Sequence, residues 1–164
     1  MKIITWNDCC KFREKFSLLV PFDADIMVIE ECEDPQRASS DSYSAFASNA
    51  LGIGHKKNKG SGVFAKPRIK IEKLAWDRLR GQRNQTTVTR LLQERGLVSA
   101  YHYVTGEAPG QESTATFYMY RDRTKLHHID YCFCSEARLK QMTVLNPNQF
   151  LAYSDHVPIA IVID

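Results

Sequence analysis

The 164-residue sequence has no apolar run long enough to cross a bilayer, so we expect no membrane partner. It begins without the basic, apolar and small-residue regions of a signal peptide, which predicts a cytoplasmic protein. Its eight glycines form neither a Rossmann nor a P-loop fingerprint. Internal repeats are also absent. With 43% hydrophobic and 25% charged residues, the chain is expected to form one globular domain over residues 1–164.

The sequence also lacks paired Cys-x-x-Cys motifs, the usual spacing of a structural zinc site. It has five cysteines, an odd number that favours free thiols in a reducing compartment. A zinc site built from the cysteines with His127 and His128 is an alternative. Buried free thiols remain the preferred interpretation.

The net charge of +3 is unevenly distributed along the chain. Residues 56–95 carry twelve basic and three acidic side chains, a net charge of +9, whereas the remainder carries −6. Residues 23–34 alone contain six acids. A basic stretch beside an acidic one suits a polyanion on one surface and a divalent cation on another. The alternative is a solvated basic face without a ligand.

Hydrophobic periodicity predicts a mixture of strands and helices, and therefore an α+β fold. Asp8 is expected to cap the first helix, and Gly96 to end the second. Gly52 and Gly54 are expected in a turn. Strands are expected at 2–6, 25–29, 43–47, 63–66, 69–74, 97–103, 114–120, 127–134 and 158–163, and helices at 8–20, 86–95 and 136–142.

Four of these strands begin with, end at or contain side chains suited to hydrolysis: Asn7, Glu31, Asp130, Asp155 and His156. Glu31 is a candidate Mg²⁺ ligand because hard cations prefer carboxylate oxygens. An adjacent carboxylate and imidazole, as in Asp155-His156, offer a metal ligand and a proton-handling group. Glu30 is expected to point to the opposite face from Glu31. The alternative roles are structural. Asn7 would be a turn residue at a strand end, Glu31 a solvated acid, and His156 a core histidine.

The order and spacing of these segments resemble the endonuclease/exonuclease/phosphatase superfamily, which includes exodeoxyribonuclease III and deoxyribonuclease I. The likeness is to stand-alone bacterial members, whose opening reads much like residues 1–16. It covers roughly residues 1–74 and 76–164. The resemblance implies a four-layer α/β/β/α sandwich of two packed mixed sheets, with the active site at strand ends between the sheets.

The sequence departs from this superfamily in its middle. A Gly-Asp-x-Asn strand, whose Asp is assigned to the attacking water, is absent, as is a central Tyr or His segment that reaches the phosphate. Trp76-Asp77 looks like the residues that normally follow that strand, so the chain reads as if a segment were deleted at about 74–76. This implies incomplete sheets, an unpaired strand edge and activity that is weak or lost.

The resemblance implies a Mg²⁺-dependent phosphodiesterase, with Mn²⁺ as the alternative ion. By this likeness Glu31 binds the metal and Asp155 adds a second carboxylate. Asn7 holds the site, His156 faces the scissile phosphate, and Asp130 accepts the other ring N–H of His156.

The basic segment favours nucleic acid as the substrate, DNA rather than RNA. Lys59, Arg78, Arg80 and Arg83 are the candidate substrate-binding residues. An inactive polyanion-binding remnant and a phosphatase acting on a small phosphorylated substrate are the alternatives, and the oligomeric state is left open.

Overall fold

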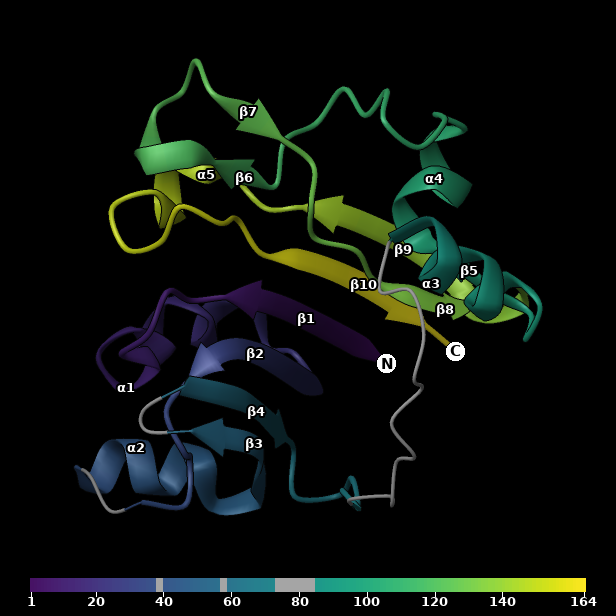
Figure 1. Ribbon diagram of the computed structural model, residues 1–164. Helices are drawn as coiled ribbons and strands as arrows, with labels where there is room; N and C mark the ends of the chain where they lie inside the picture. The colour runs from purple at the N-terminus through teal and green to yellow at the C-terminus, as the bar shows by residue number, and fades with distance from the viewer. Residues whose placement is uncertain (38–39, 57–58, 73–84) are drawn as a thin grey trace.

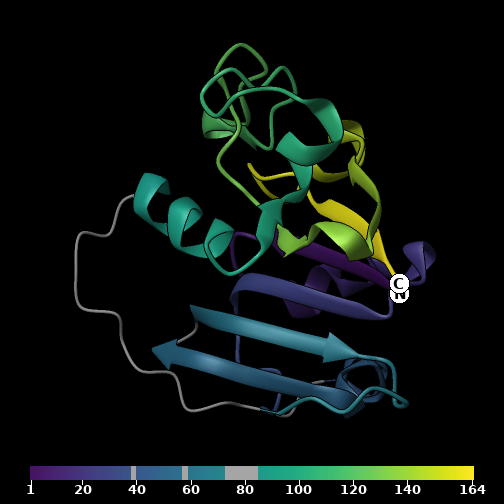
Figure 2. The ribbon, with the colours of Figure 1, turned by 90° about the vertical axis from the view of Figure 1, so that its right-hand side faces the viewer.

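The computed structural model describes residues 1–37, 40–56, 59–72 and 85–164. Its main element is a six-stranded sheet in the order β3-β4-β2-β1-β10-β9 (Figure 1). β1 and β2 are parallel, and every other neighbouring pair is antiparallel. The two chain ends lie side by side because β1 pairs with β10 (Figure 2). The strands are β1 Lys2–Asn7, β2 Ile26–Cys32, β3 Ala50–Lys56, β4 Lys59–Ala65, β9 Leu139–Val144 and β10 Ile159–Ile163.

Short helices cover one face of this sheet over an aromatic core. They are α1 Phe12–Lys15, α2 Asp41–Phe46 and α5 Pro147–Phe150, with 3-10 turns at Phe16–Leu18, Val20–Phe22 and Ala47–Asn49. Trp6 on β1 packs edge-on against Phe150, with ring centroids 5.4 Å apart. Within the described residues, no helix has the length and apolar character needed to span a membrane.

A smaller sheet lies over the opposite face. β5 Leu97–Ser99 pairs with β8 Phe133–Ser135. α4 Ala100–Thr105 follows β5 directly, and α3 Gln85–Gln93 precedes it (Figure 1). Ala100 and Cys134 pack on Ile159 and Ile161 of β10, so this second layer covers the β10 side of the large sheet. Ile26, Val28 and Val63, on the other strands, stay partly exposed.

A second two-stranded sheet is the third sheet of the described structure. β6 Phe117–Tyr118 pairs with β7 Leu126–His127, and a single bridge joins Phe117 to His156. The expected strands at 114–120 and 127–134 are therefore reduced to short pieces. Their backbone groups bond instead to side chains and to the segment before β10, as shown below.

Several expected elements are wrong because local caps and long-range pairing outweigh periodicity. Residues 43–47 belong largely to α2, since the side chain of Ser40 caps it by accepting from the Tyr43 N–H. Residues 97–103 split into β5 and α4. The expected helix at 136–142 is the 3-10 turn Glu136–Arg138 followed by β9, which is recruited by pairing with β10. Gly52 and Gly54 lie within β3.

The N-terminal and central expectations also need correction. The helix expected at 8–20 is α1 followed by two 3-10 turns, and Asp8 does not cap it. Residues 69–72 form no strand, and 73–74 lie outside the described residues. The helix at 86–95 is confirmed as α3, and Gly96 follows it with the expected positive φ of 75°.

Candidate active site

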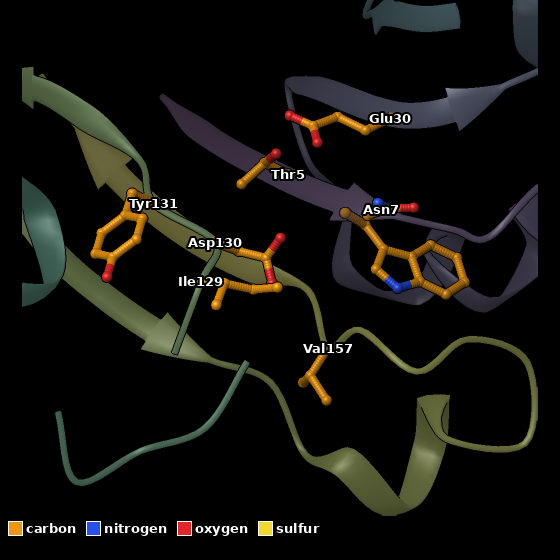
Figure 3. A pocket seen from close by; sticks show the side chains of 8 residues that line it. Thr5, Asn7, Glu30, Ile129, Asp130, Tyr131 and Val157 are labelled. Carbon is orange, nitrogen blue, oxygen red and sulfur yellow. The ribbon is translucent and has the colours of Figure 1, made fainter. Parts of the chain in front are cut away.

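A pocket of about 230 Å³ opens at the ends of β1 and β2. Figure 3 shows Thr5 and Asn7 on β1, Glu30 on β2, and Asp130 on the segment between β7 and β8. Asn7 and Glu30 are neighbours across the parallel β1–β2 pair. Val157, which leads into β10, completes the wall. Polar side chains from three separate stretches of the sequence therefore share one cavity.

His156 and Asp130 form a hydrogen-bonded pair beside this pocket. The Nδ1 atom of His156 lies 2.8 Å from Oδ2 and 3.0 Å from Oδ1 of Asp130. Only 13% of the His156 side chain and 20% of the Asp130 side chain is exposed. The Phe117 ring packs against the imidazole with centroids 4.7 Å apart. The carboxylate therefore fixes the ring orientation and leaves Nε2 as the nitrogen available to a substrate.

The backbone around His156 is tied to the end of β1. The buried Ser154 hydroxyl donates to the Asn7 carbonyl at 2.8 Å and accepts from the His156 N–H at 3.0 Å. The Trp6 indole N–H donates to the His156 carbonyl at 3.0 Å. Asn7 and His156, 149 positions apart in sequence, are therefore held in a fixed relation through Ser154 and Trp6.

Thr116 positions the other half of the pair. Its side chain is fully buried, and its hydroxyl accepts the backbone N–H groups of Ile129 and Asp130, each at 3.1 Å. Its carbonyl accepts the Val157 N–H at 2.8 Å. Thr116 thus links the segment carrying Asp130 to the one carrying His156. Sequence reasoning missed it, because a threonine in an alternating stretch gives no signal of this role.

The surroundings of His156 favour its charged form. Burial lowers the pKa of His156, but the hydrogen bond and charge of Asp130 outweigh this, with smaller contributions from Asp155 and Glu30. The net result is a pKa raised above the ordinary value of 6.5. This interaction contributes stability below the unfolded-state pKa, and the contribution is lost as pH rises through the raised value.

We expect an NMR titration to show this shift directly. The His156 imidazole should titrate above pH 6.5, and in an Asp130→Asn variant its pKa should fall because the nearby negative charge is removed. A His156 pKa unchanged by the substitution would show that Asp130 does not control the charge of the ring.

The end of β2 presents two acids in an irregular geometry. Glu30 pairs with Ser61 and Cys32 with Gly60, so Glu31 is the extra residue of a bulge. Its φ is 55°, which interrupts the simple alternation of side chains. Glu30 is among the residues that line the pocket and Glu31 is not, so the preference for Glu31 as the acid facing this cavity is not met.

The two acids have different environments. The Glu31 carboxylate bonds the Lys59 ammonium at 2.7 Å, and this pairing is the main reason that its pKa is lowered; a hydrogen bond from Asn7 contributes as well. Glu30 is exposed at the pocket mouth, yet the surrounding protein atoms desolvate it and Asp130 repels its charge, so its pKa is raised. Glu30 thus resembles a proton acceptor, and Glu31 a cation ligand.

The remaining candidate residues described by the structure, Asp155 and Lys59, do not line the pocket. Asp155 is partly buried and acts on His156 through its charge. Its carbonyl accepts the Tyr118 N–H at 2.8 Å, which anchors it to β6. Lys59 is exposed and paired with Glu31. Arg78, Arg80 and Arg83 lie outside the described residues.

Asp8, directly after Asn7, is completely buried and forms an ion pair with Lys15 at 3.3 Å. The Lys15 ammonium also donates to the Tyr153 carbonyl at 3.2 Å. Burial raises the pKa of Asp8 to about 6, although the Lys15 charge opposes this. Instead of capping a helix, Asp8 thus ties the end of β1 to α1 and to the chain before β10.

The arrangement of side chains in the described residues limits which kind of metal ion they could hold. No three His, Cys, Asp or Glu side chains converge there on one point, and the five cysteines are free thiols. A zinc-type site would need such a cluster. Mg²⁺ differs, since it is held by one or two carboxylates and keeps several waters. Glu31 with the neighbouring Asn7 amide fits that simpler requirement.

No protein-family model and no curated protein matches the sequence. Solved structures do match along the whole chain. A 3′-phosphatase from Neisseria bound to a product DNA hairpin aligns with a TM-score of 0.72 at 15% identity, covering 100% of this chain and 99% of that one.

Two further matches come from other organisms. An AP endonuclease from Archaeoglobus fulgidus aligns with a TM-score of 0.66 at 14% identity, covering 100% and 99% of the two chains. An endonuclease/exonuclease/phosphatase family protein from Leptotrichia buccalis aligns at 0.62 and 13%, covering 100% and 99%. At these low identities the structural likeness establishes the fold alone. The chain has the deoxyribonuclease I-like α+β architecture of packed sheets that its sequence resembles.

Proposed function

We propose that this chain is a Mg²⁺-dependent phosphodiester hydrolase of nuclease type that acts on DNA. The observation that carries the proposal is the His156–Asp130 pair beside a pocket that also contains Asn7 and Glu30. An oriented imidazole, an amide and carboxylates at one cavity meet the needs of phosphodiester hydrolysis: charge stabilisation and an oriented water. The fold shared with a 3′-phosphatase and an AP endonuclease supports this proposal.

In this proposal His156 contacts the scissile phosphate through Nε2. Asp130 holds the ring by its Nδ1 atom and favours the imidazolium, whose charge stabilises the pentacovalent transition state. Asn7 is anchored beside His156 through Ser154 and offers its amide to the site. Asp155 adds a carboxylate next to His156.

Glu31 is the proposed Mg²⁺ ligand, and the ion would replace Lys59 as the partner of the carboxylate. The Asn7 amide, which hydrogen-bonds Glu31, would hold that ligand in place. Mn²⁺ has the same ligand preference and is the alternative ion. Bound there, the ion would stabilise charge on the phosphate oxygens. We assign Glu30 to orienting the attacking water, the role left open by the absent Gly-Asp-x-Asn. A carboxyl with a raised pKa is suited to accepting a proton near neutral pH.

The two acids should be separable by experiment. We expect Glu31→Gln to weaken Mg²⁺ binding, measured by calorimetry, by removing the charge that holds the ion. Glu30→Gln should leave Mg²⁺ affinity within a few-fold of the parent, and at saturating Mg²⁺ should lower the cleavage rate by about 10²-fold or more, the usual size of a general-base contribution. Equal Mg²⁺ affinities in the parent and Glu31→Gln would refute the assignment.

The substrate assignment rests on charge and on one structural neighbour. Lys59, together with Arg78, Arg80 and Arg83 in the basic segment, is the proposed contact to the nucleic-acid backbone. Contacts of this kind make affinity fall steeply with salt. DNA is preferred over RNA because a structural neighbour was solved with a DNA hairpin. A cytoplasmic site of action is part of the same proposal.

The direct test is nicking of supercoiled plasmid by the purified, folded protein with Mg²⁺ or with EDTA. Nicking with Mg²⁺ and none with EDTA is the expected result. DNA binding should be measured in parallel at low and high salt. Salt-sensitive binding without any nicking would replace the enzyme by a polyanion-binding remnant, and loss of both would reject nucleic acid as the partner.

A further inference from the structure

A second, larger pocket of about 550 Å³ lies next to the first. Tyr131 lines both cavities, and it directly follows Asp130, the partner of His156. Figure 3 shows the Tyr131 side chain extending away from Asn7 and Glu30. A molecule whose phosphate lies at His156 would therefore have the second pocket beside it.

One wall of the second pocket is a rigid hydrogen-bonded group. The His102 imidazole contacts Ser99 Oγ through Nδ1 at 2.9 Å and Glu112 Oε1 through Nε2 at 3.0 Å. Glu112 also accepts the Tyr131 hydroxyl at 3.2 Å and the Gly110 N–H at 3.0 Å. The rings of His102 and Tyr131 lie nearly parallel, 12° apart, with centroids separated by 5.7 Å.

The charge of Glu112 disfavours an anion placed against this wall. Burial raises the pKa of Glu112, but hydrogen bonds from backbone N–H groups, His102 and Tyr131 lower it to about 2. Glu112 is therefore ionised at neutral pH, and it would repel a phosphate placed in this cavity.

The shape and the ring faces suit a flat, uncharged heterocycle. The polar atoms of His102 and Glu112 are hydrogen-bonded to each other and to neighbouring residues. The wall therefore presents mainly the aromatic rings of His102 and Tyr131, and Phe133 adds a third ring. α3 also contributes Gln93, whose amide can bond the edge of a base, and Arg90, which is paired with Glu94. The volume lies within the range of small-ligand sites.

We infer that the second pocket is a nucleobase subsite: it holds the base of the nucleotide whose phosphate contacts His156, by stacking against the His102–Tyr131–Phe133 wall. This inference rests on the proposed function and adds to it. It makes the enzyme recognise a nucleotide with its base unstacked from the strand, such as a terminal or extruded one, rather than an intact stacked duplex.

The test is an NMR titration of the intact protein with two probes that share a phosphate. One is deoxyadenosine monophosphate, and the other is deoxyribose 5-phosphate, which has no base. Both should shift the His156 signals. The nucleotide alone should shift the His102 and Tyr131 ring signals, and it should bind more tightly than the sugar phosphate.

Two substitutions make the test specific. Gln93→Trp adds bulk to an exposed α3 residue at the pocket and should weaken nucleotide binding, without altering sugar-phosphate binding. Arg95→Trp, on the exposed surface just beyond α3, is the matched control and should change neither. Tyr131→Leu should weaken nucleotide binding about 5- to 100-fold, the usual effect of losing one stacking ring, whereas Tyr131→Phe should retain it.

The outcomes separate this inference from the proposed function. Equal affinity for both probes, with shifts at His156 alone, overturns the base subsite and leaves the hydrolase proposal standing. Shifts at His102 and Tyr131 in a protein that does not cleave DNA support the subsite and overturn the hydrolase. Binding of neither probe overturns the subsite as well.

Discussion

Replacing His156 with alanine should reduce Mg²⁺-dependent plasmid nicking by about 10²- to 10⁴-fold, the range of a positioned proton-handling side chain. The imidazole is the group whose Nε2 is left for the phosphate after Asp130 has taken Nδ1. Its removal also leaves the partly buried Asp130 carboxylate without its cationic partner. The measurement is the initial rate of nicking at saturating Mg²⁺, under single-turnover conditions.

The matched control is His127→Ala. His127 is exposed, its backbone carbonyl accepts the Thr116 N–H, and its ring centroid lies 6.1 Å from that of Phe117. Its substitution should therefore leave the rate within about two-fold of the parent, as expected for a surface change. Retention of the parent rate by His156→Ala, with the protein shown to be folded, would exclude His156 from the chemistry and remove the main support for the proposed function.

Thr116→Val should destabilise the protein by about 2 kcal/mol, because two part-buried backbone N–H groups lose their acceptor while the side-chain shape is retained. Such a loss is a substantial fraction of the roughly 5–15 kcal/mol by which folded domains are stable. It should appear as a lower midpoint of urea unfolding with an unchanged m-value.

The same substitution should also affect the site. Without the Thr116 hydroxyl, the Ile129–Asp130 backbone is no longer fixed, so the His156 pKa should move toward 6.5. Thr116→Ser keeps the hydroxyl and should restore both properties, apart from the small cost of the lost methyl. If Thr116→Val matched the parent in midpoint and in His156 pKa, Thr116 would have no positioning role.

The sequence predicted β1, β2 and β10 well. Each is a short apolar run, and each pairs with a neighbour in the folded sheet, so local pattern and tertiary pairing agree. It failed where a local cap or a distant strand decides the conformation. Tyr43 lies in a helix because Ser40 caps it, and β9 is a strand because β10 offers it a partner. Periodicity over a few residues contains neither piece of information.

The candidate site divides in the same way. The sequence by itself determined which chemical groups are present: Asn7, the acid pair at the end of β2, Asp130 and the Asp155-His156 dipeptide, each beside an apolar run. It also determined what is missing, the Gly-Asp-x-Asn strand. These are matters of composition and order, which require no folding to read.

Tertiary structure alone decided how those groups are used. Regular alternation along β2 puts Glu30 on the face that lines the pocket, and the bulge at Glu31 lets the next residue, Cys32, return to the buried core. Thr116, with no motif to mark it, holds Asp130 for His156. The second pocket combines side chains from α3, α4 and the loops around Glu112 and Tyr131. Contacts between residues far apart in the chain depend on how the strands pair and how the layers pack. No local sequence pattern specifies which distant segment will lie next to a given strand.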